Sequence, residues 1–207
     1  MADRALRMSL IATLAWGVFS FGAVYPWAYW PLMTSCVCIG VAGFATSPRA
    51  PRPSNLLMGA MALCGIAVAV QLLPLPTALV NRLSPPALGL VKNLDLAYAL
   101  QPRATHALSI EPYATERGLA IALALSAFFI GLTRFLSRDG ARWLATSVAV
   151  IGFIVSLVGI IQKPFFTGKI YGFWSPIAPA ESFGPFINKN HFAGWMLMAL
   201  PLSLIHI

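Results

Sequence analysis

The fold class of this chain is decided by the run at residues 143–162, WLATSVAVIGFIVSLVGIIQ. It contains no charged side chain and no proline. An α-helix rises about 1.5 Å per residue, so twenty residues cover about 30 Å, the thickness of the hydrocarbon core of a bilayer. The run therefore predicts a helix that crosses a membrane.

The composition of the whole chain agrees with this prediction. Hydrophobic residues make up 58% of it and charged residues 10%, whereas about a quarter of the residues of a soluble domain are charged. We expect an all-α fold, a polytopic transmembrane helical bundle with five complete spans and the start of a sixth at His191. The five predicted spans are Ser9–Tyr25, Trp27–Ala45, Leu56–Leu75, Gly118–Leu136 and Trp143–Gln162.

The segments between the spans have recognisable patterns of their own. The aromatic and proline cluster around Pro26 separates the first two spans so closely that they are predicted to form a tight helical hairpin. Residues 77–100 are predicted to form short helices at the membrane interface, broken by Pro85 and Pro86. Residues 48–53, rich in proline and arginine, are expected to form a stiff linker.

The basic residues predict the orientation of the bundle. Short connections dense in arginine stay in the cytoplasm, and here they alternate along the chain. The arginines predicted on the cytoplasmic side are Arg4, Arg7, Arg49, Arg52, Arg134, Arg138 and Arg142. The N-terminus is thus expected inside, and the long loops 76–117 and 163–190 outside. An uncleaved first span is favoured over a signal peptide, since no small-residue cleavage site follows it.

Several functional classes have little support. The net charge of +8 is scattered through loops rather than gathered on one face, so no nucleic-acid partner is expected. Cys36, Cys38 and Cys64 lie in apolar stretches without histidine or acidic neighbours, and we predict no metal and no disulfide there. No phosphate-binding glycine loop or zinc motif is present, so no cofactor is expected.

Polar chemistry meets an apolar helix in one stretch, FGPFINKNHFAGW, at residues 183–195. Asn190 is predicted to be the N-cap of a helix that begins at His191, and unpaired backbone N–H groups would then lie beside Lys189. A helix N-terminus with a nearby cation favours an anion such as a phosphate. We therefore predict a substrate-binding site at Asn188, Lys189 and Asn190.

The imidazole of His191 is the candidate catalytic group of this stretch, as a general acid or base. A purely structural interpretation stays open beside it. In that case the two asparagines cap the helix, Lys189 reaches the lipid headgroups, His191 bonds to a loop carbonyl, and Trp195 is an interface anchor. Weaker candidates for phosphate, sugar or charge interactions are Glu111, Glu116, Arg117, Arg103 with His106, and Lys169 with Tyr171.

Residues 183–194 resemble the F-G-x-F-x-N-[RK]-N-H-F-A-G segment of the O-antigen ligase and polymerase-like family of membrane proteins. Three other segments, at residues 21–28, 71–76 and 108–115, are similar to further parts of that family in the same order. Lys189 stands where most relatives carry arginine, so the bidentate phosphate geometry of a guanidinium is absent here.

The resemblance implies a glycosyltransferase of the bacterial plasma (inner) membrane. Such an enzyme moves a saccharide from a polyprenyl diphosphate carrier to a glycan or lipid A core acceptor at the outer face, with surrounding membrane lipids as further partners. It also implies about a dozen helices, with the main catalytic Arg and His residues beyond residue 207. Ligase and polymerase both remain open. The alternative is a transporter or lipid-linked saccharide flippase, but the middles of the five spans hold no Asp, Glu or Lys, which favours an interface enzyme.

The last residues form a separate expectation. Residues 1–201 are predicted to be the N-terminal part of such a transmembrane domain. Residues 202–207, Leu-Ser-Leu-Ile-His-Ile, match the translation of a common sequencing adapter, and we expect them to be an artefact. The genomic reading frame is then expected to run beyond Pro201 into further apolar spans. A natural short tail is the alternative.

Overall fold

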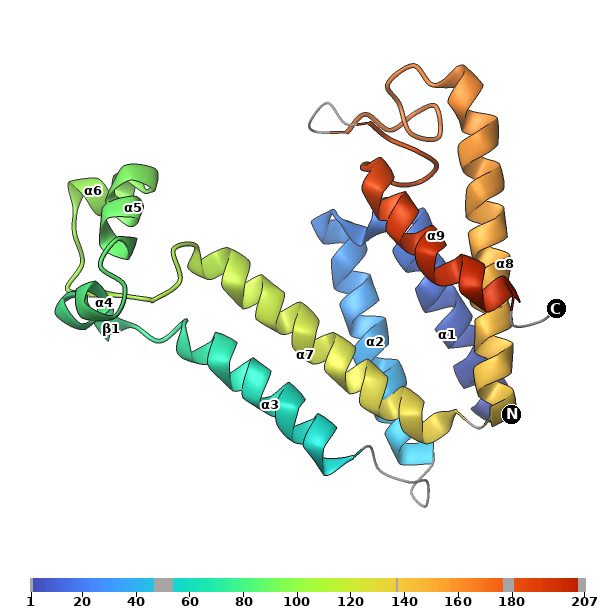
Figure 1. Ribbon diagram of the computed structural model, residues 1–207, viewed down its shortest axis with the longest axis horizontal. Coiled ribbons are helices and arrows are strands. Elements are labelled where there is room, and N and C mark those ends of the chain that lie inside the picture. The colour runs from blue at the N-terminus through green and yellow to red at the C-terminus, as the bar shows by residue number, and fades with distance from the viewer. Residues whose placement is uncertain (1, 47–53, 137, 177–180, 205–207) are drawn as a thin grey trace. The chain divides into compact units, whose positions relative to one another are not determined.

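The computed structural model describes residues 2–46, 54–136, 138–176 and 181–204, and most of them are helical (Figure 1). The only strands in this described part are two paired segments of two residues each. The all-α character is therefore confirmed. The chain divides into two compact units, Met1–Arg52 with Ala127–Ile207, and Pro53–Ser126. The linker predicted at residues 48–53 lies outside the described residues.

The first unit begins with a helical hairpin, as predicted. Helix α1 (Ala2–Phe19) and helix α2 (Pro26–Thr46) pack against each other and are joined by the 3-10 turn η1 (Phe21–Ala23). Proline is well suited to the first position of a helix, because the backbone N–H that it lacks would have no partner there. The indole Nε1 of Trp16 donates to the carbonyl of Ala28 at 2.9 Å and fixes the two helices near the turn.

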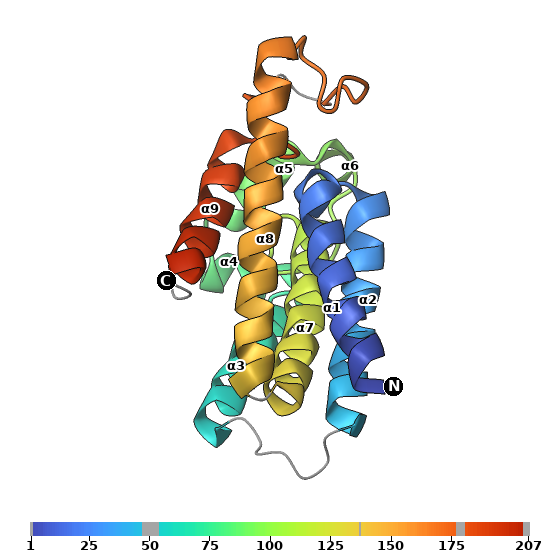
Figure 2. The same cartoon turned by 90° about the vertical axis from the view of Figure 1, so that its right-hand side faces the viewer.

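The rest of the first unit packs around helix α8 (Arg138–Gln162), which is followed by η2 (Lys163–Phe165), a long loop and helix α9 (Lys189–Leu204). Figure 2 shows α8 between α1 and α9. A buried core joins α1, α8 and the loop before α9. Its members are Val18, Ile151, Val155 and Phe186.

Helix α2 also crosses the last part of α7 (Pro112–Phe135) within the first unit, at glycines. A Cβ added at Gly43 would lie 2.6 Å from the carbonyl oxygen of Gly131, and one added at Gly131 would collide with the backbone of Gly40. Small residues of this kind let two helix backbones approach closely, which is common between helices in membranes.

The second unit holds helix α3 (Asn55–Val70), three short helices and the first part of α7. The short helices are α4 (Thr77–Leu83), α5 (Ala87–Leu94) and α6 (Leu96–Leu100), and strands β1 (Leu75–Pro76) and β2 (Thr105–His106) pair antiparallel beside them. The predicted short helices and their break at the proline pair are thus confirmed. The carboxylate of Asp95 caps α6 by accepting from the backbone N–H groups of Ala97 and Tyr98.

Three helical segments, not five, are long and apolar enough to cross a membrane within the described residues: Pro26–Thr46, Pro112–Phe135 and Gly140–Phe165. Helix α1 includes charged residues in its first two turns, so its apolar part is shorter than predicted. Helix α3 stops at Val70 and is too short, because the chain turns before Pro74. Five complete spans are therefore not confirmed.

Helix α7 begins at Pro112, six residues before the predicted start of its span. The hydroxyl groups of Ser109 and Thr115 are hydrogen-bonded at 2.7 Å across this start. Glu116 and Arg117 consequently lie within the first two turns of α7 and not before it. Both charged side chains are exposed at the start of this helix.

Candidate functional site

The candidate site lies at the N-terminus of α9, and this helix starts at a different residue from the one predicted. The helix begins at Lys189, and Asn188 takes the capping position that was predicted for Asn190. The side-chain Oδ1 of Asn188 accepts from the backbone N–H of Asn190 at 2.8 Å. The Asn188 carbonyl accepts from the N–H of His191 at 3.0 Å. Asn188 is the N-cap because its side-chain and backbone oxygens reach the N–H groups of Asn190 and His191.

The sequence predicts free backbone N–H groups at this helix end, but in the structure these groups are paired. The N–H of Lys189 donates to the carbonyl of Glu181 at 2.9 Å, and the next two N–H groups donate to Asn188. The expectation of unpaired donors is therefore wrong for these three positions. An anion at this site would be held chiefly by side-chain charge and by the dipole of the helix.

Lys189 carries that charge, and it forms an ion pair with the carboxylate of Glu181. Both side chains are exposed, Lys189 by 59% and Glu181 by 76%. Exposed ion pairs contribute only about 0.2–1 kcal/mol to stability, since water screens them and their side chains lose entropy. Lys189 and Glu181 are therefore held together only weakly.

The structure brings the four predicted residues of the site together on one exposed turn. Asn188, Lys189, Asn190 and His191 are all exposed. The imidazole of His191 makes no ion pair or side-chain hydrogen bond with any residue that the structure describes.

The loop before α9 is fixed to α8 by close packing. Gly184 has a φ of +58°, a conformation that favours glycine, and it allows the tight turn in which Phe183 and Phe186 exchange backbone hydrogen bonds of 3.2 Å. The ring of Phe183 lies directly against Gly159 of α8. The turn that carries Lys189 is consequently held by a rigid neighbour.

Gln162, at the end of α8, joins two parts of this loop. Its Nε2 donates to the carbonyl of Gly184 at 3.2 Å, and its Oε1 accepts from the backbone N–H of Tyr171 at 2.9 Å. No feature of the amino-acid sequence singles out this glutamine. Its partners lie 9 and 22 residues further along the chain, and side-chain bonds over such separations leave no periodic pattern.

An aromatic cluster attaches the same loop to the turn of the first hairpin. It consists of Phe21, Tyr25, Trp27, Tyr171 and Trp174. The rings of Phe21 and Trp174 stack with centroids 4.8 Å apart, and the indole of Trp174 donates to the hydroxyl of Tyr25 at 3.2 Å. Sequence analysis placed an aromatic and proline cluster around Pro26 but did not predict its contacts with Tyr171 and Trp174.

Tyr171 connects this cluster to the backbone of α1. Its hydroxyl donates to the carbonyl of Phe19 at 2.8 Å, and its φ of +56° places it in the left-handed region. Burial raises the pKa of Tyr171 to about 12, because the charged phenolate would lose its hydration there. The hydroxyl is thus a structural donor and not an acid near neutral pH.

Lys169 and Tyr171, paired as weak candidates in the sequence, do share a pocket. Its volume is about 360 Å³, and its residues are Val158, Ile161, Gln162, Phe165, Lys169, Tyr171 and Gly172. The polar groups of Tyr171 are already engaged, so Lys169 supplies the charge. This pocket is mostly apolar and provides no second cation.

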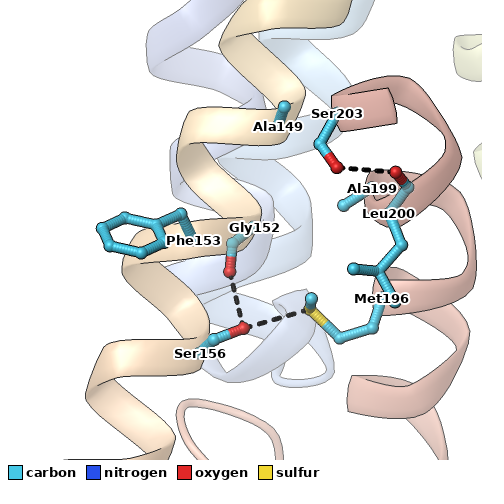
Figure 3. A pocket seen from close by; sticks show the side chains of 8 residues that line it. All are labelled: Ala149, Gly152, Phe153, Ser156, Met196, Ala199, Leu200 and Ser203. Atoms are coloured by element: carbon cyan, nitrogen blue, oxygen red, sulfur yellow. Dashed lines mark hydrogen bonds between the residues drawn. The ribbon is translucent and has the colours of Figure 1, made fainter. Parts of the chain in front are cut away.

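A groove lies between α8 and α9, the helix that carries the site (Figure 3). The helices touch at Gly152, where an added Cβ would lie 2.7 Å from the Cβ of Ala199. The hydroxyl of Ser156 donates to the carbonyl of Gly152 at 2.9 Å and contacts the sulfur of Met196 at 3.4 Å. The groove has a volume of about 180 Å³ and is mostly apolar, which indicates a packing role.

Trp195, which the structural interpretation of the sequence makes an interface anchor, contacts the interior of the first unit. It is partly buried and packs on the core that contains Ile151 and Val155. Its Nε1 is buried and has no hydrogen-bond partner among the described residues. The tryptophan therefore fastens α9 to the unit.

The remaining candidates have structural explanations. The Nδ1 of His106 is 2.7 Å from the carbonyl of Ala107, and its ring meets Tyr98 edge-on at 5.1 Å. Cys36 is buried, Cys38 and Cys64 are exposed, and all three are free. No group of three metal-binding side chains occurs within the described ranges.

The chain was compared with known proteins at three levels. It matches no family model, no curated protein and no solved structure in these comparisons.

Proposed function

We propose that this chain is part of an O-antigen ligase-like or polymerase-like membrane glycosyltransferase, which moves a saccharide from a polyprenyl diphosphate carrier to a glycan or lipid A core acceptor. One observation carries the proposal. The Asn-Lys-Asn-His sequence by which the chain resembles that family forms an exposed turn, and its lysine is paired with an exposed carboxylate. Such a cation is available to an anionic substrate.

In the first step of the proposed mechanism, the diphosphate replaces Glu181 as the partner of Lys189. A diphosphate brings two or more negative charges, whereas Glu181 brings one. The attraction between Lys189 and its partner increases with the charge of that partner. The diphosphate therefore displaces the carboxylate of Glu181, and the N-terminal dipole of α9 adds to the attraction.

The reaction itself is a displacement at the anomeric carbon. The bond from this carbon to the diphosphate oxygen breaks, and its electron pair stays with the leaving diphosphate. A hydroxyl oxygen of the acceptor forms the new bond and gives its proton to a general base, for which the imidazole of His191 is the candidate. Lys189 stabilises the charge that develops on the diphosphate, which is the usual role of a fixed cation beside a leaving group.

The proposed membrane follows from the family resemblance, and the proposed orientation follows from the arginine distribution. We place the protein in a bacterial plasma membrane with its N-terminus in the cytoplasm and with the Lys189 turn at the outer face. The lipid carrier of the donor would then reach the turn from the outer leaflet.

The test measures binding, since the resemblance assigns the main catalytic residues to positions beyond residue 207. The chain in lipid nanodiscs is titrated with a polyprenyl diphosphate that bears a fluorescent label. Lys189→Ala should weaken binding about tenfold to a hundredfold, as expected for the loss of a contact of 1.5–3 kcal/mol. Lys189→Arg should retain binding, and Glu181→Gln should strengthen it up to about fivefold.

Lys92→Ala is the matched control, because Lys92 is an exposed lysine of α5 in the other unit. It should bind like the wild type. Equal binding by the wild type and Lys189→Ala would contradict the proposal and leave the turn as a helix cap. An equal loss in both variants would also contradict it, because the attraction would then be unspecific.

A further inference from the structure

Helices α1 and α8 run side by side in the same direction (Figure 2). An apolar groove lies between them. The groove has a volume of about 360 Å³. Its walls are Ile11, Ala15 and Phe19 of α1, and Trp143, Thr146, Ser147, Val150, Ile151 and Ile154 of α8. The α1 residues are four apart, so they form one stripe along the helix.

The length of the groove matches one leaflet of a bilayer. From Trp143 to Ile154 the α8 wall extends over eleven residues, or about 16 Å at 1.5 Å per residue. Half of the hydrocarbon core of a bilayer is about 15 Å thick. A single acyl chain of a lipid that lies along the helices therefore has the right length for this groove.

One end of the groove is basic. The guanidinium of Arg7 lies over the ring of Trp143, 5.5 Å from its centroid, and Trp143 forms the wall at this end. Arg7 continues the α1 stripe by one turn beyond Ile11, and Arg4 precedes it by another. Arg142 is the neighbour of Trp143, and both Arg4 and Arg142 are exposed.

The basic residues outnumber the acidic ones in these two helix starts. The first turns of α1 and α8 contain Arg4, Arg7, Arg138 and Arg142 against Asp3 and Asp139. The side chains of Arg138 and of both aspartates lie outside the described part. The excess of positive charge fits the phosphate of a lipid, and the cation–π contact with Trp143 keeps the Arg7 guanidinium at this end of the groove.

We propose that this groove binds one anionic phospholipid, with an acyl chain between α1 and α8 and its phosphate at Arg7. Phosphatidylglycerol fits because its headgroup adds no positive charge. Phosphatidylcholine fits less well, since its choline cation would lie among the arginines. This site is separate from the Lys189 turn and does not depend on the proposed function.

The test uses the whole chain, purified in detergent and stripped of lipid. Binding of phosphatidylglycerol and of phosphatidylcholine is measured by native mass spectrometry, and stabilisation by thermal unfolding with each lipid added. The wild type should bind one phosphatidylglycerol per chain about tenfold more tightly than phosphatidylcholine, the effect of one charge-assisted contact. Equal binding of the two lipids by the wild type would overturn the proposal without any variant.

Three variants separate the headgroup site from the acyl-chain site. Arg7→Gln should abolish the preference for phosphatidylglycerol, and Ala15→Phe, which fills the groove, should weaken the binding of both lipids. Arg82→Gln, on α4 of the other unit, should behave like the wild type. If Arg82→Gln and Arg7→Gln lose the preference equally, lipid is attracted by surface charge alone and the proposed site does not exist.

Discussion

Tyr171 shows how a single side chain can attach a loop to the end of the first helix. Its hydroxyl donates to the carbonyl of Phe19, and the carbonyl would lose this partner if the hydroxyl were removed. Removal of one such hydrogen bond costs about 0.5–1.5 kcal/mol. The residue is therefore a sensitive point at which to measure the attachment of the loop.

We predict that Tyr171→Phe lowers the free energy of unfolding by about 0.5–1.5 kcal/mol near neutral pH. Burial raises the pKa of Tyr171 from 10.0 to about 12, so the folded state favours the protonated phenol. The resulting stability is complete below pH 10 and is lost as the pH rises towards 12. Thermal unfolding of both proteins should show the wild type losing its advantage in this window. A constant difference from pH 8 to 12 would contradict the prediction.

The residues of the candidate site illustrate what the sequence could and could not predict. The turn at Lys189 was visible, since capping asparagines before an apolar helix form a local pattern. The pairing of Lys189 with Glu181 and the bridge made by Gln162 were not visible. Both depend on the path of a loop whose conformation is set by packing on α8 and not by local propensity.

At the scale of elements, the crossing of α2 with the last part of α7 depends on the absence of side chains. A Cβ at Gly131 would collide with the backbone of Gly40, which cannot move aside as a flexible side chain could. Gly194, in the middle of α9, has no neighbouring atom within 4 Å of an added Cβ. Gly131 and Gly194 thus allow a tightly packed helix glycine to be compared with one that has open space beside it.

We predict that Gly131→Ala destabilises the protein by about 1–3 kcal/mol, the usual cost of overpacking. Gly194→Ala should be neutral or stabilise it by up to about 1 kcal/mol, because alanine is the better helix former. Thermal unfolding in one detergent would measure both. Similar melting temperatures for the two variants would show that the crossing is looser than this geometry requires.

Helix boundaries were the weakest part of the sequence-based prediction. Hydrophobicity located every long helix, yet α1 starts seven residues before its predicted span and α9 two residues before its own. A hydropathy pattern marks where a helix can contact lipid. The helix itself extends into polar residues for as long as caps such as Asn188 satisfy its backbone.

At the scale of the whole molecule, the arginine-rich connections predict the orientation in a membrane. Reporter fusions after Pro51, Asp95, Asp139 and Ser175 should read inside, outside, inside and outside in turn. The alternation results from the excess of arginine in the short connections. An outside reading at Pro51 or Asp139 would reverse the orientation, and the Lys189 turn would then face the cytoplasm.

The aromatic cluster also has a consequence for the timing of biosynthesis. Tyr171 and its partner Phe19 are separated by 152 positions in the chain. At a translation rate of about 5–20 residues per second, the turn of the first hairpin waits roughly 8–30 seconds for the loop that covers it. During this interval the rings of Phe21 and Tyr25 contact each other and Trp27, but the aromatic surface that Tyr171 and Trp174 later cover stays exposed. The nascent hairpin therefore has an incomplete aromatic core until Tyr171 and Trp174 emerge from the ribosome.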